Sequence, residues 1–173
     1  MFMKPALNKK YLHITLILAL NLLILSGCNQ NSDQREFEQQ AFSEPSGITE
    51  TDQQGNVVEG NIDPDDWRIA PFFQGDIELL LPPFPNPVLS NGELKIEIQV
   101  NFLERISGIY IRVFRFSSFY QIDDRPQVPT GLTSFRIDAN IIAGEISNPQ
   151  GIYRIIIQDE NENVITYGDV EIE

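Results

Sequence analysis

The stretch "ELKIEIQVN", residues 93–101, decides the fold. Leu94, Ile96, Ile98 and Val100 alternate with charged and polar side chains, and no glycine or proline interrupts the run. Successive side chains of a β-strand point to opposite faces of a sheet, so this alternation predicts a strand with one apolar face. That face needs a second apolar layer to cover it, which favours a layered β-structure.

The same two-residue period recurs on both sides of this strand. Turn-forming Gly, Pro and Asn residues separate the runs, and none holds a helical period over ten residues or more. Further strands are predicted within residues 77–81, 108–116, 132–138, 151–159 and 163–173. The last two form a hairpin across "DENEN". Short strands at this spacing predict an all-β antiparallel sandwich of about six to seven strands.

The connections between the strands hold two groups of interest. A long connection, "SSFYQIDDRPQVPTG" at 117–131, is predicted to cross between the sheets, and loops on rigid scaffolds commonly carry recognition. Its candidate binding residues are Tyr120, Asp123, Asp124 and Arg125.

An aromatic group before the first strand is predicted to plug one end of the core, with an exposed binding strip as the alternative. This group comprises Trp67, Ile69, Phe72 and Phe73.

Three short motifs follow one another through the predicted sandwich. They are Pro85-Asn86-Pro87 before a strand, "IYIRVF" at 109–114, and Gly151-Ile152-Tyr153 at the start of the penultimate strand. In this order they resemble the Ig-like domain of flagellar hook-capping proteins and the related C-terminal sorting domains of type IX secretion substrates. The resemblance covers roughly residues 75–173 and implies an Ig-like sandwich. Sorting domains follow a large effector and end in basic residues. This chain has neither feature, so the resemblance implies the fold rather than the sorting role.

The composition changes before residue 61. Gln, Glu, Ser and Asn dominate residues 29–60, and large apolar side chains are sparse there. Such a segment buries too little apolar surface to offset the entropy lost on ordering. We therefore expect residues 28–60 to form a disordered tether behind a modified Cys28. Residues 61–173 are expected to form one domain with its own core.

The N-terminal 27 residues have the order of an export signal. Three lysines precede an apolar run at 14–25, and small residues follow it: the lysines are Lys4, Lys9 and Lys10, and the small residues are Ser26 and Gly27. The apolar run is shorter than the roughly 20 residues that a membrane-spanning helix needs. We therefore expect a cleaved signal peptide rather than a permanent membrane span.

Residues 25–28, "LSGC", closely resemble a bacterial lipobox. The resemblance implies cleavage before Cys28, diacylglycerol on its sulfur and an acyl chain such as palmitate on its new amino group. Two or more acyl chains hold a protein stably at a membrane. In diderm bacteria an Asp at position 30 would favour inner-membrane retention. The chain has Asn29 and Gln30 instead, so the resemblance implies the outer membrane of the cell envelope.

The mature chain would be strongly acidic. Loss of the three leader lysines changes the formal charge from −13 to −16. This charge repels nucleic-acid phosphates, so no nucleic-acid partner is expected. The only histidine, His13, lies in the leader, and the only cysteine would be acylated. The mature chain would therefore lack Ser-His-Asp and Cys-His catalysis, His/Cys metal sites and disulfides.

Acidic turns are the remaining candidates for chemistry. Calcium prefers several oxygen ligands in a flexible loop, and the weak candidate ligands are Asp63, Asp65, Asp66, Asp123, Asp124 and Asp159. None of these turns has the full calcium-loop pattern, which favours solvated turns. No other cofactor is expected.

The sequence therefore predicts a non-enzymatic envelope lipoprotein. Its membrane partner would be reached through the lipid anchor, and its sandwich would contact an envelope protein or a glycan. Two alternatives stay open. One is a calcium-dependent adhesion or binding module. The other is a small carboxylate hydrolase, which would need two carboxyl groups converging in a cleft.

Overall fold

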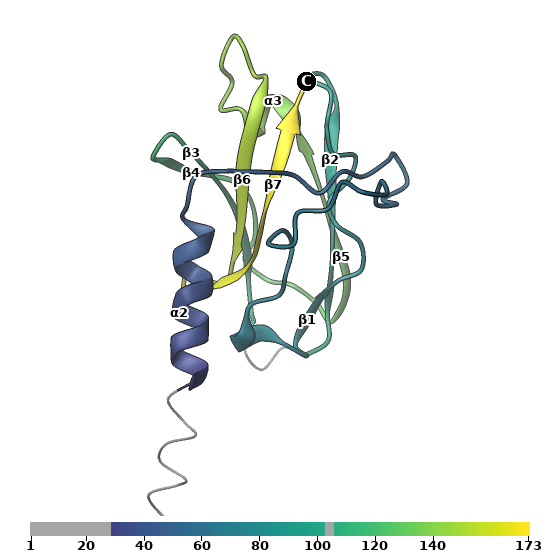
Figure 1. Ribbon diagram of the computed structural model, residues 1–173. Coiled ribbons are helices and arrows are strands. Elements are labelled where there is room, and N and C mark those ends of the chain that lie inside the picture. The colour runs from purple at the N-terminus through teal and green to yellow at the C-terminus, as the bar shows by residue number, and fades with distance from the viewer. Residues whose placement is uncertain (1–28, 103–105) are drawn as a thin grey trace, which may run out of the picture.

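Two antiparallel β-sheets packed on one core make up most of the molecule (Figure 1). The computed structural model describes residues 29–102 and 106–173. The first sheet has the order β1-β2-β5, with β1 at Ile77–Leu79, β2 at Glu93–Val100 and β5 at Gly131–Asp138. The second has the order β4-β3-β6-β7, with β4 at Ser118–Arg125, β3 at Ile109–Arg115, β6 at Gly151–Gln158 and β7 at Val164–Ile172. The predicted all-β sandwich is confirmed.

Strand β2 is the centre of the first sheet. Its four alternating apolar side chains are completely buried, while Lys95 and Glu97 between them keep some contact with solvent. It pairs with β1 on one side and β5 on the other, where Ile96 lies opposite Phe135. The two-residue period of the sequence therefore corresponds directly to the inner and outer faces of this sheet.

The prediction that residues 117–131 form a loop is wrong for residues 118–125. Residues Ser118–Arg125 form strand β4, which pairs with β3 after a two-residue turn at Phe116-Ser117. β4 lies at the edge of its sheet and is largely exposed, so it shows little apolar alternation. Charged side chains are common on edge strands because they discourage pairing with another chain. The same charges made the segment look like a loop.

The predicted disorder of the tether is also wrong. Residues Asn29–Ala41 form helix α2, which stands against the outer face of β7 (Figure 1). Phe37 and Ala41, four residues apart on one side of the helix, are buried, and the Phe37 ring lies 4.9 Å from the Tyr167 ring. Side chains at this spacing share a helix face. Two apolar residues and a set of hydrogen bonds order a segment whose average composition predicts disorder.

The chain after α2 stays packed on the sandwich. Thr49 and Thr51 are buried, and the backbone N–H of Thr51 donates to the Asn86 carbonyl at 2.8 Å. The Asn86 side chain donates to the carbonyls of Thr49 and Asp169 and accepts from the Glu171 N–H. Asn86 is completely buried, and its amide satisfies three backbone groups there. The Pro-Asn-Pro motif thus joins the N-terminal segment to β7.

The free edge of β7 is covered by earlier parts of the chain. The N–H groups of Trp67 and Ala70 donate to the β7 carbonyls of Tyr167 and Ile165 at 2.7 and 2.8 Å. A Cβ on Gly168 would lie 2.3 Å from the Trp67 ring, so only glycine leaves room for the indole. The short helix η1 (Pro71–Phe73) follows.

The predicted aromatic plug is confirmed in part. Trp67 and Phe73 are buried, and Ile69 packs partly buried against the core. Phe72 is exposed instead, at 46% of its surface. Because the Trp67 backbone pairs with β7, this part of the group covers the edge of the sandwich beside that strand.

A buried ion pair joins α2 to the sheet. Arg154 of β6 makes two hydrogen bonds to the Asp169 carboxylate of β7, at 2.7 and 2.8 Å, and both side chains are almost fully buried. Its remaining nitrogen donates to the carbonyls of Gln40 and Ser43 at the end of α2, at 2.8 and 3.1 Å. A cation at the C-terminus of a helix satisfies carbonyls that the helix itself leaves unbonded. We call these four residues the Arg154 clasp.

Asp66 adds a second, partly buried carboxyl beside the clasp. Its two oxygens accept the backbone N–H groups of Asp169 at 2.8 Å and Thr49 at 2.7 Å. Burial raises the pKa of Asp66 to about 7 against the opposing effect of these N–H donors, and the Asp169 charge acts in the same direction as burial. The folded chain therefore binds the Asp66 proton more tightly than the unfolded chain does.

Removal of the clasp cation should strongly destabilise the fold. Arg154→Met leaves the Asp169 carboxylate buried without its partner, which costs on the order of 3–5 kcal/mol. The matched control is Arg136→Met, whose ion pair with Glu93 is exposed and should contribute less than about 1 kcal/mol. Urea unfolding of both variants measures the free energies. Equal losses would show that the clasp is not a special determinant of stability.

Stability should fall as the pH rises between the usual Asp66 pKa of 3.8 and its folded-state value of about 7. Between the usual value of 3.8 and about 7, the folded chain holds the Asp66 proton more tightly than the unfolded chain does. Folding is therefore favoured less as this proton is lost. Urea unfolding between about pH 5 and pH 8 should give a shallower decline for Asp66→Asn than for the unchanged chain. Asp65→Asn, at an exposed neighbouring carboxyl, should leave the decline unchanged.

Candidate functional site

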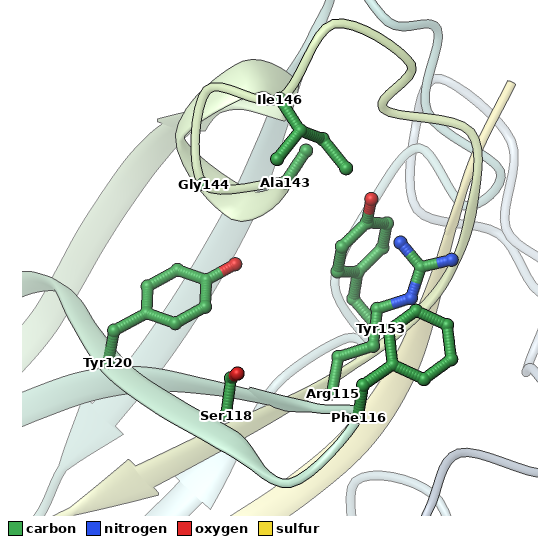
Figure 2. Close-up of a pocket in the computed structure, with 8 residues that line it drawn as sticks. All are labelled: Arg115, Phe116, Ser118, Tyr120, Ala143, Gly144, Ile146 and Tyr153. Atoms are coloured by element: carbon green, nitrogen blue, oxygen red, sulfur yellow. The ribbon is translucent and has the colours of Figure 1, made fainter.

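A pocket of about 430 Å³ opens at one end of the sandwich (Figure 2). Its volume lies in the range of small-ligand sites. Its floor comes from β3, β4 and β6, and its opposite wall comes from the loop that follows helix α3 (Ala139–Ile142). The lining residues are Arg115, Phe116, Ser118, Tyr120, Ala143, Gly144, Ile146 and Tyr153. We call this site the Arg115 pocket.

The alternation of the strands places the floor residues. Ile109, Ile111 and Val113 of β3 are buried in the core, and Arg115 is the next residue on the same face. It pairs across the sheet with Ser118. Because the loop after α3 takes over from the facing sheet at this end, Arg115 lines a hollow instead of a packed core. Figure 2 shows its guanidinium beside the Tyr153 and Phe116 rings.

Two tyrosines flank the hollow with their rings held in place. The Tyr120 hydroxyl donates to the carbonyl of Ile142 in α3, and the Tyr153 hydroxyl donates to the Pro149 carbonyl at 2.6 Å. Burial raises the pKa of both phenols, and the Arg115 charge opposes that effect. Both phenols are therefore neutral at physiological pH, and their hydroxyl protons are already donated to backbone carbonyls.

Arg115 supplies the positive charge of the site. Its guanidinium lies 4.1 Å from the centre of the Tyr153 ring and 4.6 Å from that of the Phe116 ring. In the described part of the chain it has no carboxylate partner; it donates to the Gln150 carbonyl at 3.5 Å, and a side-chain hydrogen bond to Tyr153 opposes the rise in pKa that burial causes in that phenol. By contrast, carboxylates pair with Lys95, Arg68, Arg112, Arg125, Arg136 and Arg154.

The rim of the pocket holds unusual backbone. Phe116 and Ser117 form the β3–β4 turn with φ of 48° and 58°, and Phe116 is 76% exposed. A positive φ is unfavourable for a bulky side chain. The Glu44 carboxylate accepts the N–H groups of both turn residues at 3.3 Å. Across the pocket, Gly144 and Glu145 have φ of 71° and 56°. Strained backbone held by surrounding contacts is often found at functional sites.

The structure separates the four candidate binding residues. Tyr120 lines the Arg115 pocket as a strand residue. Asp123, Asp124 and Arg125 lie toward the other end of β4, where Arg125 pairs with Ile109, the first residue of β3. There Arg125 contacts the Asp123 carboxylate at 3.3 Å. The four residues therefore do not form one binding loop.

The sequence contained a signal for Arg115 that the interpretation above did not use. In "GIYIRVFRF" the inward positions run Ile109, Ile111, Val113 and then Arg115. An arginine is rarely buried without a partner, so an arginine that continues an inward series marks the end of the core or a site. Its neighbour Tyr153 belonged to a motif that implied only the fold.

The acidic candidates for calcium serve as hydrogen-bond acceptors. Asp63 accepts the Asp65 N–H at 2.9 Å, and Asp66 is the partly buried carboxyl that accepts the Thr49 N–H. Asp159 accepts the N–H groups of Asn161 and Asn163 within the β6–β7 turn. Across residues 29–102 and 106–173, no three or more His, Cys, Asp or Glu side chains gather in a group that could hold a metal ion. Cys28 and the signal segment 1–27 lie outside the described residues.

Comparisons with known proteins give little further information. No family model matches the sequence, and no curated protein matches it. A solved structure titled "Structure of T.fusca AA10A" matches with a TM-score of 0.35 and 10% sequence identity, over 52% of this chain and 53% of that chain. A likeness at this level, over about half of each chain, says nothing about function. The expected resemblance to hook-capping and type IX sorting domains receives no support and stays a prediction.

The rim turn should be more stable with residues suited to its backbone. Asn-Gly is the preferred pair for a two-residue turn with two positive φ values. The double change Phe116→Asn and Ser117→Gly should therefore raise the free energy of unfolding by roughly 0.5–1 kcal/mol. Urea unfolding measures this gain. A loss of stability would mean that the exposed Phe116 ring contributes more by packing than its backbone costs.

Proposed function

We propose that the chain is a non-enzymatic lipoprotein of the bacterial cell envelope that binds a protein or glycan ligand in the Arg115 pocket. The observation that carries the proposal is the position of this pocket relative to α2. The pocket opens at the end of the sandwich opposite to the end where α2 begins. A lipid on Cys28, the residue before α2, would thus leave the pocket facing away from the membrane.

Contacts along α2 give its direction. Near its start, Gln34 donates to the carbonyl of Val164, the first residue of β7, at 3.3 Å. Just beyond its end, Glu44 contacts the β3–β4 turn at the pocket rim. Figure 1 shows the same arrangement, with the start of α2 at the lower end of the sandwich and α3 at the upper end. The helix therefore leads from the end of the molecule nearest Cys28 toward the pocket.

The ordered helix changes how an anchor would act. A helix of 13 residues spans about 20 Å. Because α2 begins at Asn29 and packs on β7, a lipid on Cys28 would hold the head near the bilayer in a restricted range of orientations. The acidic surface of the mature chain would repel anionic headgroups. This repulsion favours an orientation in which the sandwich does not lie flat on the membrane and the start of α2 is the part nearest the bilayer.

The side chains in the pocket suit binding better than catalysis. The eight lining residues include no carboxylate, histidine or cysteine, and the two tyrosine hydroxyls are already bonded to carbonyls. General acid–base catalysis needs a group that can exchange a proton near neutral pH. Aromatic rings with one cation are common features of recognition sites. The outer membrane remains the proposed location because Asn29 and Gln30 follow the cysteine.

Membrane attachment should depend on Cys28. None of the helices within residues 29–102 and 106–173 is both long and apolar enough to span a bilayer. Cys28→Ser should abolish incorporation of a palmitate analogue in a bacterial host and move the protein out of the membrane fraction. Ser26→Ala, which keeps a small residue before the cysteine, should leave both properties unchanged. Recovery of the intact N-terminus with an unmodified Cys28 thiol would contradict the proposed anchor.

A further inference from the structure

The chemistry of the Arg115 pocket narrows the class of ligand. The guanidinium is already oriented, because the Tyr153 and Phe116 rings lie 4.1 and 4.6 Å from it. A guanidinium has five N–H donors, and within the described residues Arg115 hydrogen-bonds the Gln150 carbonyl and the Tyr153 oxygen. Most of its donors are thus available to a ligand that supplies acceptors.

The other polar groups of the pocket do not compete for that role. The hydroxyl protons of Tyr120 and Tyr153 are donated to carbonyls of the protein. Ser118, on the strand beside Arg115, adds a hydroxyl at the floor. The site therefore presents one fixed positive charge, and a cationic ligand would be repelled by it. An anionic group that accepts hydrogen bonds is the complementary partner.

The lack of a carboxylate for Arg115 is unusual in this chain. The sequence has 25 acidic residues and 12 basic ones, so acidic partners are abundant. Six other cations of the described part have such partners, as described above. A guanidinium and a carboxylate form two parallel hydrogen bonds, as Arg154 and Asp169 do. The same geometry at Arg115 calls for a carboxylate that residues 29–102 and 106–173 do not supply.

The remaining walls are apolar. Ala143 and Ile146 form one side, and the Phe116 ring forms another; Ile146 and Phe116 are 49% and 76% exposed. Exposed apolar side chains around a polar centre indicate a surface that is covered when a ligand binds. The body attached to the carboxylate should therefore be an apolar chain or an aromatic ring.

We propose that the Arg115 pocket binds a carboxylate carried on an apolar or aromatic body. Arg115 pairs with the carboxylate, and Tyr120, Tyr153 and Phe116 pack against the body. The chemistry fits a small organic acid and equally the C-terminus of a protein that ends in an apolar residue. This inference rests on the proposed binding function of the pocket and specifies its ligand.

Matched acids and amides test the inference on the mature chain purified from membranes in detergent. The small probes are N-acetyl-L-phenylalanine and N-acetyl-L-phenylalaninamide. The peptide probes are an octapeptide ending in phenylalanine and its amidated form. Calorimetry should show that at least one acid binds about tenfold or more tightly than its amide. Preference for the small acid points to a metabolite, and preference for the peptide acid points to a protein C-terminus.

Two variants connect that preference to Arg115. Arg115→Gln should reduce the affinity for the acid to that for the amide, and Arg115→Lys should restore only part of it, because ammonium lacks the planar pair of donors. Arg136→Gln, on the other sheet, should bind like the unchanged chain. Thermal unfolding confirms that each variant is folded. Equal affinity for acid and amide, or an unchanged preference in Arg115→Gln, overturns the inference.

The outcome separates this inference from the anchoring proposal. If no probe binds up to about 10 mM, the inference is overturned whether or not Cys28 carries lipid. Mass spectrometry of the same preparation determines the modification of Cys28. An unmodified Cys28 together with acid-selective binding would contradict the lipid anchor and support the carboxylate ligand. A lipidated Cys28 without binding of any probe would support the anchor and contradict the carboxylate ligand.

Discussion

The paired charges of Arg154 and Asp169 are the constraint on which the rest of the structure depends. An ion pair inside a protein is costly unless hydrogen bonds satisfy all its polar atoms. The sheet alone cannot do this, because Arg154 extends from its outer face. The carbonyls of Gln40 and Ser43 complete the set. The sheet therefore needs the N-terminal segment to satisfy the buried Arg154 guanidinium. The segment in turn needs that guanidinium to bond the free carbonyls at the end of α2.

This mutual dependence determines which surfaces are covered. With α2 and the following chain on its outer face, the second sheet buries both faces of β6 and β7. Tyr167 becomes a core residue that contacts Phe37 on one side and Arg154 on the other. The edge of β7 is occupied by the backbone of residues 67–70. On the inner face, the loop after α3 replaces the facing sheet beyond Val113, and the Arg115 pocket opens there.

How well the sequence predicted each part depends on how local the determining contacts are. The alternation of β2 and the hairpin of β6 and β7 are local patterns, and both were predicted correctly. β4 was missed because an edge strand needs no apolar face, and α2 was missed because Phe37 and Ala41 are its only buried hydrophobic residues among those described. The carbonyl partners of Arg154, at Gln40 and Ser43, lie more than 100 residues away in the chain. No periodicity in one segment contains that information.

The pocket depends on the N-terminal segment as well. Its rim turn has two positive φ values and no glycine, so the hairpin alone has little reason to adopt this backbone. Glu44 accepts both N–H groups of the turn and follows α2 by three residues, just past the carbonyls that Arg154 holds. The clasp therefore positions Glu44, and Glu44 holds the turn that carries Phe116 to the pocket. If Cys28 carries lipid as proposed, the anchor and the ligand are joined through one docked helix, and the residues that resembled a loose tether determine the shape of the binding site.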